Sequence, residues 1–186
     1  MPAVLAMWTP EDGLLGALAP LGLAAAAGTA LVIDLDPGGP RYPGPRSLAD
    51  LVADGPRRAD LEPERTGVAV LRNGGIAAQD TGDVVRALIA RWPRVVVRLP
   101  PRPVAAGGGI PTVVVRLLVP GGLFPGDTRP AVYQSTPHPM QLPGPGIRLP
   151  VPSRRTTAAL LAGRVPAAGN RWVRAWRKAW EVPWTR

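Results

Sequence analysis

The feature that most constrains the fold is an uninterrupted apolar run that ends in an acidic turn. Residues 30–35 are apolar except for Asp34, and the run is followed by Asp36, a proline and two glycines. A strand with one solvated face alternates apolar and polar residues, whereas a continuous apolar run is typical of a strand buried on both faces of a parallel sheet. We therefore predict a buried parallel strand at residues 30–35.

Similar runs recur along the chain and alternate with helical patterns. Further strands are expected at residues 3–7, 67–71, 94–99, 112–119, 131–134 and 147–151. Helices are expected at residues 14–27, 48–53, 81–92, 154–162 and about 170–182, and residues 55–65 are expected to form a loop. Alternating strands and helices predict an α/β fold, a three-layer sandwich around a mainly parallel sheet of five to seven strands.

The length and composition fit one folded domain. The chain has 186 residues, which is a normal size for a single domain, so we expect one domain over residues 1–186. Its 25 prolines and 22 glycines cluster between the apolar runs, which predicts long, stiff loops. Cysteine is absent and His138 is the single histidine, which argues against disulfides and a zinc cluster.

The expected location rests on two kinds of segment that we do not find, a signal peptide and a membrane span. The N-terminus has no convincing signal peptide, and no clean run of about 18 apolar residues suggests a membrane span. We expect a cytoplasmic protein, with contact to the inner face of the membrane as an alternative.

The charge is strongly basic and is carried by arginine. The formal net charge is +9, and among 22 basic residues only Lys178 is a lysine. A basic surface attracts nucleic acid, anionic lipid or acidic protein. The abundance of arginine with alanine, glycine and proline also fits a GC-rich gene, so ordinary solvated charge is the alternative interpretation.

Several segments are similar to one family. Residues 32–39 read Val-Ile-Asp-Leu-Asp-Pro-Gly-Gly and resemble the Val-Asp-x-Asp-Pro-x-Gly segment of the MinD/ParA family of deviant P-loop ATPases. Residues 92–101 resemble that family's Tyr-Asp-x-Val-Val-Val-Asp-x-Pro-Pro strand, and residues 147–166 resemble its late Ile-Pro-x-Asp stretch. The resemblance covers most of the chain and includes the CpaE/TadZ-like members that help to place Flp pilus machinery. It implies a P-loop NTPase-like fold.

The chain departs from this family where the phosphate loop is expected. Residues 9–17 read Thr-Pro-Glu-Asp-Gly-Leu-Leu-Gly-Ala, so Gly13 and Gly16 remain as turn formers but no lysine is present to reach the phosphates. No serine or threonine follows to hold Mg²⁺. Glu11 and Asp12 place negative charge where phosphates would lie, a repulsion of about 1–4 kcal/mol per charge pair at ~4 Å.

The second acidic position of the family has also changed. The aspartate expected to organise Mg²⁺ is replaced by Arg98, whereas Asp34 and Asp36 remain. Two interpretations of these aspartates stay open: they pair with arginines such as Arg98, or they end the strand and cap its turn. We predict a vestigial nucleotide pocket at Gly13, Gly16, Asp34, Asp36 and Arg98, with no catalytic residue, no metal and no cofactor.

The C-terminal helix carries two kinds of residue on different faces. Trp172, Trp176 and Trp180 recur every four residues and form one stripe of the helix. Its basic residues, which lie on another face, are Arg171, Arg174 and Lys178. Two arrangements remain open: the tryptophans dock on the sheet as core, or they form an exposed partner-binding or membrane-surface element.

These observations predict a non-enzymatic protein, a pseudo-ATPase that serves as a scaffold or localisation factor. We expect a protein partner, bound through the six tryptophan, arginine and lysine residues of the C-terminal helix, and the resemblance implies a place in pilus or secretion-system assembly. The alternative is a nucleic-acid-binding or anionic-membrane-binding protein without ATPase activity. Nucleotide is not expected to bind, so any homodimer should be constitutive or driven by a partner.

Overall fold

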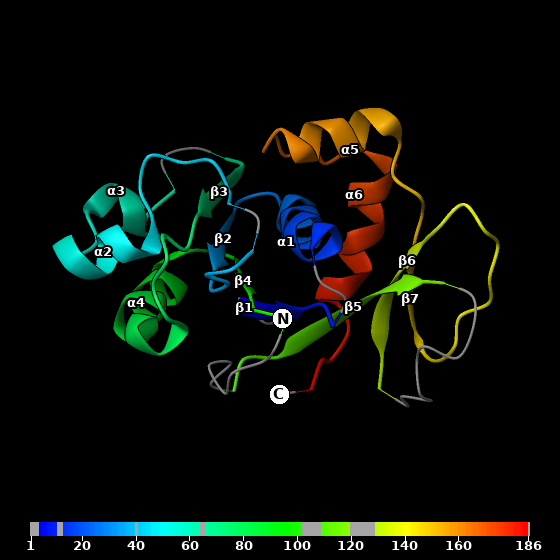
Figure 1. Ribbon diagram of the computed structural model, residues 1–186, viewed down its shortest axis with the longest axis horizontal. Helices are drawn as coiled ribbons and strands as arrows, with labels where there is room; N and C mark the ends of the chain where they lie inside the picture. The colour runs from blue at the N-terminus through cyan, green and yellow to red at the C-terminus, as the bar shows by residue number, and fades with distance from the viewer. Residues whose placement is uncertain are drawn as a thin grey trace.

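A computed structural model describes residues 4–10, 13–39, 41–63, 66–101, 109–119 and 129–185. Seven strands of this part of the chain form one sheet, and all of its pairings are parallel. Figure 1 shows the sheet in the order β3-β2-β4-β1-β5-β6-β7. The strands are β1 (Val4–Trp8), β2 (Ala30–Asp34), β3 (Val68–Leu71), β4 (Val95–Arg98), β5 (Thr112–Leu118), β6 (Ala131–Ser135) and β7 (Gly146–Leu149).

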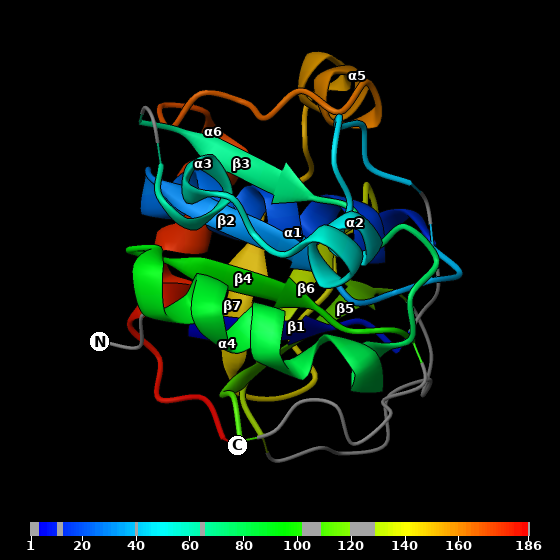
Figure 2. The ribbon, with the colours of Figure 1, turned by 90° about the vertical axis from the view of Figure 1, so that its left-hand side faces the viewer.

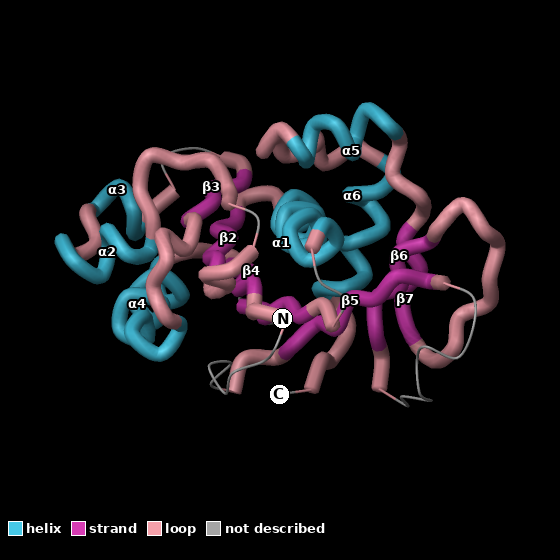
Figure 3. Tube along the Cα trace, in the orientation of Figure 1, coloured by secondary structure: helices cyan, strands magenta, loops and turns pink. Residues whose placement is uncertain are grey.

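Helices cover both faces of this sheet, which gives three layers (Figure 3). On the first face lie α1 (Leu14–Ala27), α5 (Arg154–Leu161), α6 (Arg171–Ala175) and the 3-10 helix η3 (Trp176–Trp180). On the second face, beside β3, β2 and β4, lie α2 (Leu48–Asp54), α3 (Arg58–Leu61), the 3-10 helix η1 (Ala78–Thr81) and α4 (Gly82–Arg91). In Figure 2 the strands β3, β2 and β4 are stacked between α1 behind and α4 in front. The predicted α/β class is therefore confirmed.

Strand β2 shows why the apolar run is continuous. All five of its residues are buried. Ala30 and Val32 belong to the core under α1, whereas Leu31 and Ile33 belong to the core under α2 and α4. Because successive side chains of a strand point to opposite faces, burial on both faces requires an apolar residue at every position.

Most predicted elements are present within one or two residues of their expected bounds. Helix α1 has the predicted bounds and continues through Pro20, with Gly28 at its C-cap at a φ of 88°. Ser47 caps α2 in a reciprocal capping box with Asp50. The expected loop at residues 55–65 contains the short helix α3, and α4 begins after a 3-10 turn.

The C-terminal helix differs from its prediction in shape. Only residues 171–175 are α-helical, and residues 176–180 continue as a 3-10 helix. Trp172 and Trp180 are buried, and Trp176 has no exposed surface. All three belong to the core that includes α1. The first of the two open arrangements is correct, and the prediction that the tryptophans bind a partner is wrong for this conformation because they are covered by α1.

Helix α1 accommodates these tryptophans through a glycine. A Cβ atom on Gly22 would lie 2.5 Å from the Cη2 atom of Trp172 and 2.5 Å from the Nε1 atom of Trp176. The rings of Trp172 and Trp176 meet edge to face, with centroids 5.7 Å apart. Gly22 therefore allows the close approach of α1 and α6.

Candidate functional site

The predicted pocket lies where three neighbouring strands end. Arg98, the last residue of β4, is in register with Asp34 of β2 on one side and with Met7 of β1 on the other. In open parallel α/β sheets, ligands bind outside the carboxyl ends of the strands. The structure thus brings Asp34, Asp36 and Arg98 to the edge of the sheet at which nucleotides are held in such folds.

Arg98 fills the centre of this position with its own guanidinium group. Its Nη1 atom lies 3.3 Å from each carboxylate oxygen of Asp34, and its Nη2 atom donates to Oδ2 of Asp36 at 2.6 Å. The exposed fraction is 3% for Arg98 and 2% for Asp34. A buried charge is tolerated when it is paired and hydrogen-bonded, and this arginine has two carboxylate partners. We call Asp34, Asp36 and Arg98 the Arg98 cluster.

The two aspartates also shape the turn after β2. The Asp36 N–H donates to Oδ1 of Asp34, and the Gly38 N–H donates to Oδ1 of Asp36, both at 3.0 Å. Both interpretations of these aspartates are therefore correct, because the same carboxylates pair with Arg98 and cap the turn.

Two residues that sequence reasoning missed, Gly39 and Tyr42, pack against the Arg98 cluster. The Tyr42 ring lies 5.6 Å from the Arg98 guanidinium carbon, and its hydroxyl donates to the Ala17 carbonyl of α1 at 2.7 Å. A Cβ atom on Gly39 would overlap the Arg98 guanidinium, so glycine lets the loop cross it closely. In the sequence, the only sign of these contacts was the Pro/Gly-rich composition of the loop after β2. Composition does not predict the path that a loop follows.

Burial controls the electrostatics of the cluster. Removal from water raises the pKa of the Asp34 carboxyl to about 6, and the nearby Arg98 charge offsets only part of this effect. Burial likewise raises the pKa of the Tyr42 hydroxyl. Asp34 is thus a carboxyl whose charge is disfavoured by its surroundings even though it faces a cation.

Little space remains between this cluster and the expected phosphate loop. The cavity that borders Gly13, Gly16, Asp36 and Arg98 has a volume of about 10 Å³. That is roughly the space that one water molecule needs. Glu11 and Asp12 lie outside the described residues. In this conformation the described residues do not fit Mg-ATP, because the Arg98 guanidinium lies where the resemblance places the metal and the cavity of about 10 Å³ beside it is too small for phosphates.

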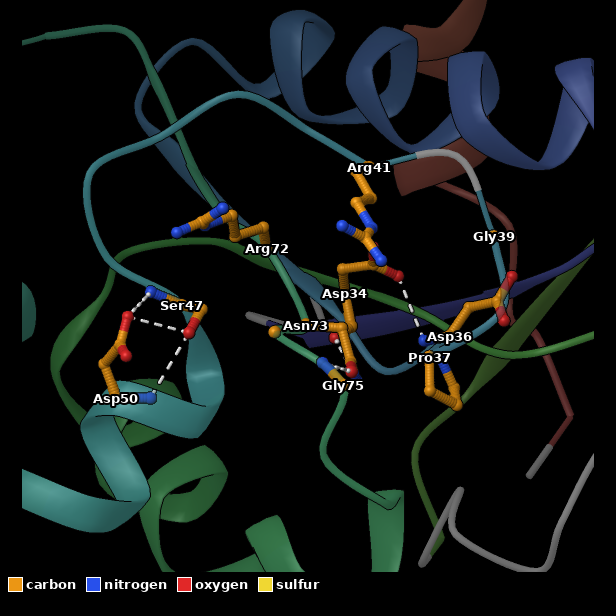
Figure 4. Close-up of a pocket in the computed structure, with 11 residues that line it drawn as sticks. Asp34, Asp36, Pro37, Gly39, Arg41, Ser47, Asp50, Arg72, Asn73 and Gly75 are labelled. Carbon is orange, nitrogen blue, oxygen red and sulfur yellow. Dashed lines mark hydrogen bonds between the residues drawn. The ribbon is translucent and has the colours of Figure 1, made fainter.

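A larger cavity lies beside the cluster, between the ends of β2 and β3 (Figure 4). Its volume is about 270 Å³, and its walls carry both signs of charge. The cationic side chains are Arg41 and Arg72, and the anionic ones are Asp34, Asp36 and Asp50. Hydrogen bonds from Ser47 lower the pKa of Asp50. A wall of mixed sign favours a small polar occupant over a polyanion.

The predicted basic residues lie elsewhere. Arg171, Arg174 and Lys178 are exposed and line a groove with β7, at the other end of the sheet. They do not join the Arg98 cluster. The tryptophans between them face α1, as described above, so the two faces of the C-terminal segment separate into a buried face and a basic exposed face.

No group of three or more potential metal-ligating side chains is found among the described residues. None of their helices has both the length and the apolar character needed to cross a membrane. His138 is exposed on its loop.

Comparisons with known proteins give only distant structural likenesses. The chain matches a structure described as the BceF tyrosine kinase domain with 18% identity and a TM-score of 0.44, over 62% of this chain and 56% of that one. It matches cobyrinic acid a,c-diamide synthase from Mycobacterium smegmatis, bound to an ATP analog and magnesium, with 15% identity and a TM-score of 0.45, over 94% and 91%. No family model and no curated protein matches. At this similarity no family membership follows, and the α/β class rests on the strand order and register of this chain.

Proposed function

We propose that this chain is a non-catalytic α/β scaffold protein, related to MinD/ParA-type ATPases, that binds a protein partner and no nucleotide. The observation that carries the proposal is the Arg98 cluster. A buried guanidinium paired with two carboxylates stands where a metal and phosphates would need room, and the adjoining space is about 10 Å³. A protein with this interior can present binding surfaces, but it would not change conformation in response to a bound triphosphate.

Isothermal titration of the full chain with ATP and Mg²⁺ tests the proposal. We expect no saturable heat. Because a chain with a net charge of +9 attracts any polyanion, the titration needs a control for surface binding. That control is the R171E/R174E/K178E variant at low and high salt. Micromolar binding that persists in this variant and at high salt would locate ATP in the fold and contradict the proposal.

The partner and the assembly state follow from the same proposal. Without nucleotide, a homodimer of this chain would form constitutively or with its partner, so analytical ultracentrifugation should give the same mass with and without Mg-ATP. A mass that increases only with Mg-ATP would contradict the proposal.

A place in pilus or secretion-system assembly is the finer form of the proposal, and only the sequence resemblance supports it. Pilin or pilus-assembly ATPase genes next to the gene for this chain would favour it. An unrelated operon would remove its support.

A further inference from the structure

A groove runs along the free edge of the sheet, between β7 and α6. Its volume is about 940 Å³. In the described part of the chain, β7 pairs with β6 and has no strand on its other side. Three of the four residues of β7 line the groove, namely Gly146, Ile147 and Arg148. An unpaired strand edge offers main-chain N–H and C=O groups to another extended segment.

The charged residues of the groove all have the same sign. Arg171, Arg174 and Lys178 from the C-terminal segment line it together with Arg148 from β7, and no acidic residue among those that the structure describes does. Arg171 and Arg174 come from α6 and Lys178 from η3, so consecutive helical segments present all three to the groove. None of the four forms an ion pair with a carboxylate of the described residues. Their positive potential is therefore available to an outside ligand.

Apolar side chains lie among these cations. Leu142, Ile147 and Val151 also line the groove, and Val151 is 49% exposed. A nucleic acid or a lipid would leave the strand edge unpaired, because neither carries a row of main-chain N–H and C=O groups. A peptide has main-chain groups, apolar side chains and carboxylates, so it matches all three features.

We propose that this groove binds an acidic segment of a partner protein, which adds to β7 as an extended strand. The inference rests on the protein-binding role proposed above and specifies the chemistry of the partner. Alternate side chains of an added strand point to the same face, so carboxylates at every second position would meet Arg171, Arg174 and Lys178. Pro145 and Pro150 bracket β7 and lack an N–H, which limits the pairing to about four residues.

Fluorescence anisotropy with a labelled peptide of alternating Glu and Val residues tests the charge requirement. We expect saturable binding to the full chain, and none for the peptide with Lys in place of Glu. The R171E/R174E/K178E variant should bind at least ~10-fold more weakly, about 1.4 kcal/mol. The matched control is R154E/R155E/R177E, which changes the net charge equally at exposed residues outside the groove and should retain most of the affinity. Equal weakening in both variants would overturn the proposal.

Two N-methylated peptides test the strand requirement without changing the protein. Methylation at every second residue removes the N–H groups along one edge of the added strand. One methylation pattern should abolish binding and the complementary pattern should retain it, because only one edge faces β7. Equal effects of the two patterns would overturn the proposal.

The competing ligands give a different outcome. Duplex DNA or phosphatidylserine vesicles that bind through the groove cations, in a protein that does not bind the acidic peptide, would overturn the proposal and assign the groove to that ligand. Failure of the peptide in a chain that also binds no ATP overturns this inference alone. Persistent ATP binding overturns the proposed function, whatever the peptide does.

Discussion

Arginines in two regions of the sheet differ in burial and in pairing. At the ends of β2 and β4, Arg98 is buried and its charge is matched by Asp34 and Asp36. Beside β7, Arg171 and Arg174 are exposed and have no carboxylate partner among the described residues. The first region pairs its own charges, whereas the second, in the proposal above, leaves its charges for a partner. Cationic residues alone therefore do not indicate a binding site, because pairing and burial decide which cations are available.

Removal of Arg98 should produce the largest effect. Arg98→Ala leaves two buried carboxylates without a cation, and breaking a buried ion pair in this way typically costs about 3–5 kcal/mol of unfolding free energy. Urea denaturation followed by circular dichroism measures the loss. Arg174→Ala is the control from the exposed region. If the two variants lost equal stability, the contrast between buried and available arginines would be wrong.

The pH dependence of stability should report the charge of Asp34. Its pKa is about 6 in the folded protein and near 3.8 in a model carboxyl. Between these values the folded protein holds a proton that the unfolded chain has released. The contribution of Asp34 to the unfolding free energy therefore decreases as the pH rises from about 4 to above 6, by on the order of 2–3 kcal/mol.

Urea denaturation of the wild type and of Asp34→Asn at about pH 4.5 and about pH 7.5 isolates this contribution. Wild type should lose more stability than the variant on going to the higher pH. Other carboxyls, including Asp50, titrate in both proteins and cancel in the difference. An identical change in both proteins would show that Asp34 titrates as an ordinary exposed carboxyl.

Gly22→Ala should weaken the support of the basic groove. The added Cβ atom would lie 2.5 Å from the nearest atoms of Trp172 and Trp176, and overpacking of this kind costs about 1–3 kcal/mol. Thermal unfolding and the near-ultraviolet spectrum of the tryptophans report it. Gly16→Ala is the matched control in the same helix, because its nearest neighbours would lie 3.9 Å away. A larger loss in Gly16→Ala would contradict the described packing of α1 on α6.

Neutralising the groove should have the smallest effect on stability. The R171Q/R174Q/K178Q variant removes exposed charges that pair with no described carboxylate, so its unfolding free energy should stay within about 0.5 kcal/mol per site of the wild type. Urea denaturation measures this. A loss of unfolding free energy comparable to that of Arg98→Ala would mean that these cations stabilise the fold and are not available to a partner.

The sequence predicted the centre of the sheet well because β1, β2 and β4 are buried on both faces. Continuous apolar runs located β2 and β4. The pairing of Arg98 with the two aspartates was foreseen as one of two alternatives. Local patterns carried this information, so reading along the chain was sufficient.

The remaining features depend on contacts between distant segments. Tyr42 reaches Arg98 from a Pro/Gly loop whose path no periodicity specifies. Glycine inside a helix ordinarily lowers its stability, yet Gly22 makes room for Trp172 and Trp176, which are 150 or more residues later in the chain. The amphipathic pattern of the C-terminal segment was equally compatible with docking and with exposure. Such a pattern identifies the apolar face of a helix but not the surface that this face contacts.

The packing of the C-terminal tryptophans on α1 sets a temporal order for the protein's biogenesis. The Trp180 indole donates to the Leu23 carbonyl at 3.0 Å, across 157 residues of sequence. While the chain is being synthesised, the side of α1 that packs on the C-terminal tryptophans has no cover until residues 172–184 emerge. The final packing of α1 therefore follows the release of residues 172–184 from the ribosome, and until then this side of the helix is open to contact with other chains.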